Sequence, residues 1–154
     1  MDDGPREIRL RGRLVNSLYT EAMLLADEAR AYFDQAGREH REALDPLRRV
    51  TLSCESLKIT TRLMHVLAWL LTERAIEIGQ TDETEAGAIG RRLGEAAPTH
   101  VEATEGLPAQ AIALIDASQD LYARVRRLEN DASATAVTAT SPALSLLDRL
   151  ERAF

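Results

Sequence analysis

Apolar residues recur at alternating steps of three and four through residues 46–78, and this stretch organises the rest of the chain. The first row with this spacing is Leu47, Val50, Cys54, Leu57, Thr61, Met64, Ala68, Leu71, Ala75 and Ile78. Such steps are typical of the seam of a left-handed helical bundle. One uninterrupted helix is therefore predicted, about 50 Å long. Asp45 and Pro46 suit its N-terminus, and Gly79 suits its C-terminus.

A second apolar row lies well round the same helix. Its members are Leu52, Ile59, Leu63, Val66 and Leu70. Two rows need two kinds of neighbour, and apolar surface that the chain's own helices leave uncovered usually marks an interface. We therefore expect a homodimer and place its interface on Leu63, Val66 and Leu70.

A narrow polar strip on this helix contains Arg62, with His65 and Trp69 close to its edge. We regard these three residues as candidate partner contacts, because Trp and Arg are enriched at binding hot spots. The alternative for Trp69 is packing inside the bundle or the dimer.

Two more helices are predicted, over about residues 17–43 and 108–130. The seam of the earlier one is Val15, Leu18, Ala22, Leu25, Ala29, Tyr32 and Ala36. The seam of the later one is Leu107, Ala111, Leu114, Ser118, Leu121, Val125 and Leu128. A short connection makes the first two helices antiparallel neighbours. The sequence thus predicts an all-α fold, an elongated antiparallel three-helix bundle within residues 16–131.

The remaining segments are less apolar. Residues 1–15 are expected to form a flexible arm, and residues 79–107 a long acidic connector that is either a contact surface or a solvated crossover. Residues 132–154 are expected to be a flexible tail that ends in a short amphipathic helix. Its Leu144, Leu147 and Leu150 are candidate partner contacts with the spacing of a docking motif; alternatively the tail folds back on the bundle.

Composition narrows the classes of protein. The chain has 154 residues, of which 45% are apolar and 4% aromatic, and its net charge is −6. This composition is typical of one globular domain and argues against nucleic-acid binding, which needs a concentrated basic surface. We expect a cytoplasmic protein without a membrane segment, because no apolar run is long enough to cross a bilayer and no signal peptide is visible.

Reactive side chains do not form a recognisable catalytic, metal or cofactor site. Cys54 is expected to be a small buried hydrophobe, and His65 lies roughly 16 Å away along the same helix, too far to activate it. None of the histidines follows a glutamate by three residues, the pair that holds metals in helical bundles. We therefore predict that the protein is not an enzyme and has no cofactor.

Two stretches carry a family resemblance. SLYTEAMLLADEARAYFD (residues 17–34) and LSCESLKITTRLMHVLAWLL (residues 52–71) closely resemble the bacterial cell-cycle family named for the regulator of CtrA degradation. The resemblance implies an elongated, dimeric three-helix bundle that acts as an adaptor and helps to deliver regulatory proteins to the ClpXP protease. A helical dimerisation module with an unrelated regulatory partner is the alternative.

Overall fold

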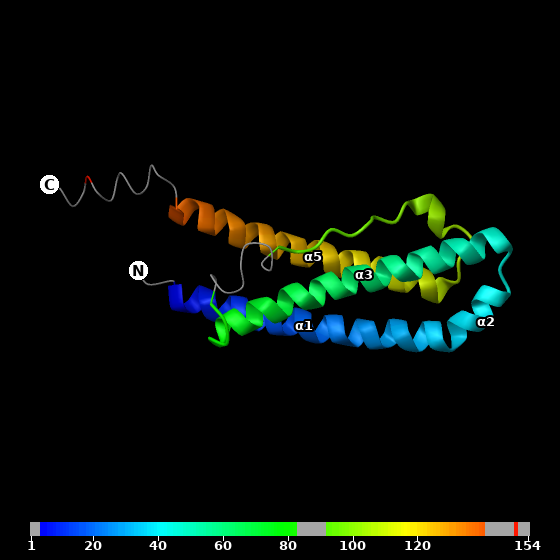
Figure 1. Ribbon diagram of the computed structural model, residues 1–154, viewed down its shortest axis with the longest axis horizontal. Helices are drawn as coiled ribbons and strands as arrows, with labels where there is room; N and C mark the ends of the chain where they lie inside the picture. Colours follow the sequence, from blue (N-terminus) through cyan, green and yellow to red (C-terminus); the bar gives the residue numbers. More distant parts are fainter. Residues whose placement is uncertain (1–3, 83–91, 141–149, 151–154) are drawn as a thin grey trace.

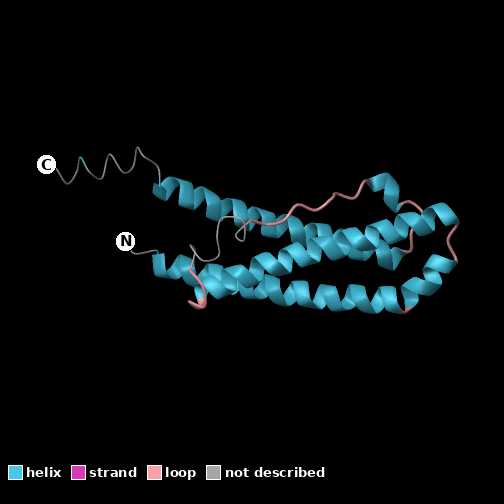
Figure 2. Ribbon diagram, viewed as in Figure 1, coloured by secondary structure: helices cyan, strands magenta, loops and turns pink. Residues whose placement is uncertain are grey.

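The computed structural model describes residues 4–82, 92–140 and 150 of the chain. Three long helices lie side by side in an elongated bundle (Figure 1): α1 (Gly4–Asp34), α3 (Pro46–Glu77) and α5 (Ala109–Thr140). A short helix, α2 (Ala36–Glu42), joins α1 to α3, and a turn of 3₁₀ helix, η1 (Val101–Thr104), precedes α5. The described residues contain helices and no strand (Figure 2), which confirms the all-α prediction.

The long helices do not simply alternate in direction. α1 is antiparallel to α3, so that Arg11 near its start forms an ion pair with Glu73 near the end of α3. α3 and α5 run in the same direction, and residues 92–108 lead back along the bundle to the start of α5 (Figure 1). The long connector is therefore the crossover that a parallel pair of helices requires.

The ends of α3 are those that the sequence predicts. The carboxylate of Asp45 accepts a hydrogen bond of 2.9 Å from the backbone N–H of Arg48, and Pro46 is the first helical residue. Beyond Ile78, Gly79 takes a φ of +75°, a left-handed conformation that costs glycine little.

The seams predicted for the other two long helices form the core. The six seam residues of α1 are buried and the seventh, Ala36, is half-buried. The predicted seam of α5 is buried throughout except for the half-buried Leu128. On α3, however, the buried apolar residues are Trp69 and the whole of the second row: Leu52, Ile59, Leu63, Val66 and Leu70.

This arrangement corrects the predicted dimer interface. Leu63, Val66 and Leu70 are at most 5% exposed in the single chain, so a dimer that keeps this fold has no access to them. The physical reason is packing. Every residue of the second row is a bulky aliphatic that fills the space against the neighbouring helices, whereas Cys, Thr and Ala in the first row would leave gaps in a core.

Two predicted boundaries at the N-terminal side are also corrected. The expected arm of residues 1–15 is helical from Gly4, and its side chains Arg11 and Val15 engage the rest of the bundle. The predicted helix 17–43 is broken at Gln35, whose φ and ψ of −121° and −97° are not helical. The break lets α2 turn across the end of the bundle (Figure 2).

α5 extends further than predicted, to Thr140 instead of about residue 130. The prediction rested on the small apolar bulk of ASATAVTATS, which cannot form a core. Alanine nevertheless has the highest helix propensity, and the chain has no glycine or proline between Pro108 and Pro142 to stop the helix. A residue can therefore extend a helix without contributing to a core.

Candidate interaction surfaces

The first row of α3 forms an apolar stripe on the outside of the bundle. Its large members are between 48% and 77% exposed, namely Leu47, Val50, Leu57, Met64, Leu71 and Ile78. The small members between them are uncharged, so that no charged side chain interrupts the row. A stripe of this length with heptad spacing is the pattern that one helix presents to another.

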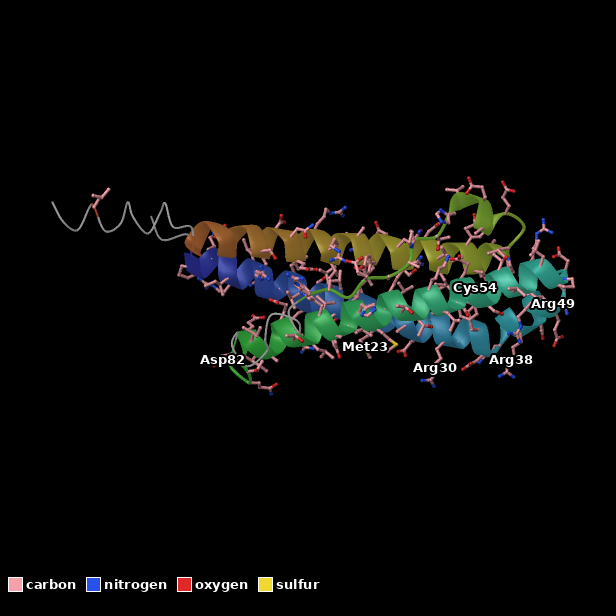
Figure 3. The ribbon with its side chains drawn as sticks, turned by 45° about the horizontal axis from the view of Figure 1, so that its top comes forward. Met23, Arg30, Arg38, Arg49, Cys54 and Asp82 are labelled. Atoms are coloured by element: carbon pink, nitrogen blue, oxygen red, sulfur yellow. The ribbon has the colours of Figure 1, made fainter. Side chains whose placement is uncertain are left out.

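Cys54 belongs to this stripe and is exposed, which corrects the expectation that it is buried. It was assigned to the core because it keeps the spacing of the first row. Cys54 is labelled on α3 in Figure 3. It is exposed because the whole first row of α3 lies on the outer face of the bundle. The thiol consequently offers a natural attachment point for a probe of this surface.

A second surface lies on a different face of α3, where residues 92–100, here called the strap, run along α3 and α5. The strap is neither helix nor strand and leads into η1 (Figure 1). The side chain of Leu93 is 3% exposed and belongs to the core cluster. At Gly94 a Cβ atom would overlap the ring of His65, so the close approach of the strap to α3 requires glycine there.

Buried polar side chains of α3 and α5 hold the strap. Arg62, only 2% exposed, donates hydrogen bonds to Ser118 Oγ (3.1 Å), Ala97 O (3.0 Å) and Thr99 Oγ1 (2.7 Å). Thr99 in turn donates to the buried carboxylate of Glu55. Burial lowers the pKa of the Arg62 guanidinium from its usual value, while the nearby Glu55 opposes that shift.

Of the three partner contacts predicted on α3, Arg62 and His65 lie beneath or beside this strap, and Trp69 belongs to the core cluster. Arg62 and Trp69 are both 2% exposed, and His65 is half-buried against Gly94. The structure thus brings Arg62 and His65 together at one surface, but the strap rather than solvent covers it. Sequence reasoning missed Thr99 and Tyr122, and the one available signal was Ser118, a polar residue inside an apolar seam.

Of the partner contacts predicted in the tail, Leu150 is described and is 54% exposed. Leu144 and Leu147 lie outside the described residues. Their part in binding stays a prediction.

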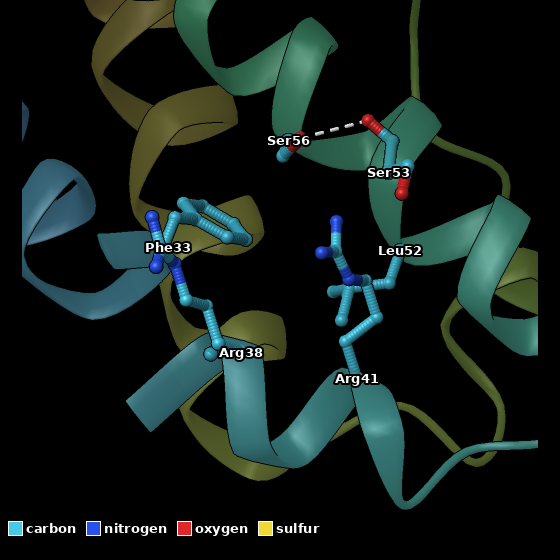
Figure 4. Close-up of a pocket in the computed structure, with 7 residues that line it drawn as sticks. Phe33, Arg38, Arg41, Leu52, Ser53 and Ser56 are labelled. Atoms are coloured by element: carbon cyan, nitrogen blue, oxygen red, sulfur yellow. Dashed lines mark hydrogen bonds between the residues drawn. The ribbon is translucent and has the colours of Figure 1, made fainter. Parts of the chain in front are cut away.

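A small pocket lies where α1, α2 and α3 meet (Figure 4). Its volume is about 100 Å³, and its lining is Phe33, Gly37, Arg38, Arg41, Leu52, Ser53 and Ser56. The hydroxyl of Ser56 donates to the carbonyl oxygen of Ser53 at 2.7 Å. Cofactor and drug-sized ligand sites commonly occupy about 300–1,000 Å³, so we assign no cofactor to this pocket.

Two other kinds of site were searched for in the described part of the chain. No group of three or more His, Cys, Asp or Glu residues within it is arranged to hold a metal ion. No helix within it combines the length and the apolar character needed to cross a membrane.

Comparison with known proteins gives relatives for this bundle. Residues 7–154 match the family described as "Protein of unknown function (DUF1465)". The crystal structure of RcdA from Caulobacter crescentus CB15 matches with a TM-score of 0.64 and 34% sequence identity, covering 77% of this chain and 89% of RcdA. No curated protein sequence matches the chain. The match to RcdA confirms the family resemblance noted for residues 17–34 and 52–71.

Proposed function

Because the chain belongs to the family described as "Protein of unknown function (DUF1465)", matched over residues 7–154, and is related to RcdA, we propose that it is a non-enzymatic proteolytic adaptor. In this role it helps to deliver cell-cycle regulatory proteins to a protease. The sequence resemblance points to ClpXP as that protease. The proposal takes the protein's work to be binding, with no chemical step of its own.

The observation that carries the proposal is the uncovered apolar stripe on α3. Monomeric proteins rarely expose a large contiguous apolar patch unless another molecule covers it. Here six large aliphatic side chains, each at least 48% exposed, follow one face of a 32-residue helix. An adaptor needs such a surface, because it works by holding other proteins together.

We further propose that a second copy of the chain covers this stripe. The first row has heptad spacing and no charged member, so it is complementary to itself, as a symmetric interface must be. This placement replaces Leu63, Val66 and Leu70, which the fold buries. A dimer would leave the strap outside the α3–α3 contact.

The physical basis of delivery in this proposal is effective concentration. A rigid bundle that binds cargo on one surface and protease machinery on another raises the local concentration of each near the other. Leu144, Leu147 and Leu150 are the proposed contact of the tail with such a partner. Arg62 and His65 become available to a partner only where the strap moves aside, whereas Trp69 is part of the core cluster.

Turnover of candidate cell-cycle regulators, in extracts that lack this protein and then receive it at known concentration, tests the proposal. We expect a specific regulator to disappear several-fold faster with the protein present, and only while the protease is supplied with ATP. Extracts without ATP are the control. Unchanged turnover with folded protein would contradict the adaptor role.

In that case the alternative, a dimerisation or interaction module with an unrelated regulatory partner, would be favoured. Capture on immobilised protein distinguishes the two functions. Protease subunits and cell-cycle regulators among the bound proteins support the adaptor, and their absence beside another stable partner supports the module.

A further inference from the structure

The strap occupies a groove between α3 and α5 mainly through its backbone. Lys58 Nζ donates to Pro98 O at 3.3 Å, and the hydroxyl of Tyr122 donates to Gly94 O at 2.7 Å. Arg62 donates to Ala97 O at 3.0 Å. These bonds come from both α3 and α5. They end on backbone carbonyl oxygens, so they hold the backbone of the strap and do not depend on its side chains.

In a fourth hydrogen bond the backbone of the strap is the donor instead of the acceptor. The backbone N–H of Leu93 donates to the carboxylate of Glu129 at 3.1 Å. Tyr122 is itself held in place, since Arg126 donates to its hydroxyl at 2.7 Å. Backbone-directed bonds supply affinity in peptide recognition, and pockets for particular side chains supply specificity.

Two side chains of the strap fill specific positions. Leu93 enters the core cluster, and the hydroxyl of Thr99 lies between Arg62 and Glu55, accepting from the first and donating to the second. Pro98 and Glu95 stay exposed. The groove therefore distinguishes an aliphatic anchor, a glycine directly after it and a hydroxyl six positions after the anchor, and it places fewer demands on the residues between Gly94 and Thr99.

The floor of the groove also restricts what can occupy it. Glu55 and Arg62 are buried charges, and a buried charge without hydrogen-bond partners is costly. An apolar helix would leave without acceptors the Arg62 donors that now bond to Ala97 and Thr99. An extended backbone with carbonyl oxygens and a hydroxyl satisfies them.

From these contacts we propose that the α3–α5 groove is a binding site for an extended peptide segment of a protein partner, and that the strap closes this site in cis. The segment has an aliphatic residue followed directly by glycine and, six positions after the aliphatic residue, a Thr or Ser. A partner must compete with the tethered strap, whose effective concentration is high, so an open groove binds more tightly than a closed one. The proposal stands independently of the adaptor role.

The test uses the full chain in which residues 92–100 are replaced by nine Gly and Ser residues. The probe is a fluorescent peptide with the sequence of the strap, RLGEAAPTH, followed by fluorescence anisotropy. We expect saturable binding to this variant and at least about tenfold weaker binding to the natural chain. Absence of saturable binding to a variant with native helicity would overturn the proposal.

Groove variants locate the binding. In the strap-replaced chain, Lys58→Met combined with Tyr122→Phe removes two donors to the peptide backbone and should weaken binding about tenfold. Arg127→Met, an exposed residue of α5 that makes no contact with the strap, is the matched control and should change nothing. Equal binding by both variants, or by a scrambled peptide, would contradict the groove as the site.

A second variant with fewer changes keeps the proposal testable if the strap-replaced chain does not fold. If the strap-replaced variant lacks native helicity by circular dichroism, the same titration is made with Leu93→Ala combined with Thr99→Ala, which keeps the backbone of the strap. The fluorescent strap peptide should then bind this double variant more tightly than it binds the natural chain. Equal, weak binding by the two chains would overturn the proposal.

Discussion

At the scale of single residues, the α3–α5 groove shows how a small helical bundle accommodates buried charge. Glu55 and Arg62 are almost fully buried, yet each has partners: Lys58 Nζ lies 2.8 Å from Glu55, and Ser118 and the strap surround Arg62. In the described residues every buried side-chain nitrogen and oxygen has a hydrogen-bond partner. Such pairs persist because removing one member leaves the others buried and unsatisfied.

Replacing Arg62 should therefore destabilise the bundle more than its size suggests. Arg62→Met removes the donors to Ser118, Ala97 and Thr99, and we expect a loss of about 3 kcal/mol in the free energy of unfolding. Urea unfolding followed by circular dichroism measures it. The control, Arg127→Met on the exposed side of α5, should cost less than about 0.5 kcal/mol. Similar values for the two variants would contradict a structural role for the network.

Asp45 gives a prediction about pH. Two hydrogen bonds from Arg48 lower the pKa of the Asp45 carboxyl in the folded chain. The bond from the backbone N–H has the larger effect, and the bond from the side chain has the next largest. A carboxyl whose pKa is lower in the folded than in the unfolded chain stabilises the fold fully at pH values above its unfolded-state pKa. This stabilisation is lost as the pH falls through the folded-state pKa.

Asp45→Asn keeps a capping side chain but removes the charge. The natural chain should have the higher melting temperature at neutral pH, and the difference should shrink as the pH falls below about 4, the usual value for Asp. Thermal melts of both chains across that range measure it. A difference that stays constant on acidification would contradict the assignment.

At the scale of elements, α3 shows what periodicity predicts and where it stops. Its ends, its length and both apolar rows are recognisable in the sequence, and the seams of α1 and α5 are the ones that the structure buries. Which row of α3 faces the chain's own helices is a tertiary question. Both rows have helical spacing, so the pattern by itself could not choose between them.

The strap illustrates a different limit. Its bonds run from Lys58, Arg62 and Tyr122 to backbone carbonyls, and backbone groups are the same whatever the sequence. Neither periodicity nor composition therefore marks residues 92–100 as docked. The α5 extension was missed for a related reason, because alanine favours a helix through its propensity even in a segment with little apolar bulk.

The tail is the element for which the adaptor role makes its own prediction. Leu144→Asp combined with Leu147→Asp should lower the protein-dependent turnover of the regulator several-fold, since a carboxylate is costly in an apolar groove. Ser145→Asp, off the predicted apolar side, is the matched control. Helicity should be the same in both. Equal turnover by the two variants would remove the tail from the delivery step.

At the scale of the whole molecule, α3 has two apolar faces with two tasks. One face folds the chain by packing against α1 and α5, and the other remains at the surface as the first row. The core of the bundle is thus fully packed, but the first row of α3 leaves apolar side chains exposed on its surface. In our account a second copy completes it, and the strap and tail remain available to other partners.

Sedimentation velocity over a range of concentrations tests this account most directly. The natural chain should sediment as a dimer that dissociates on dilution, and Leu57→Glu, in the middle of the first row, should sediment as a folded monomer. Leu24→Glu on α1 is the matched control, because Leu24 is 65% exposed and Leu57 is 67% exposed. It should dimerise like the natural chain. A natural chain that stays monomeric throughout, or equal behaviour of the two variants, would contradict the claim that the first row of α3 joins two copies.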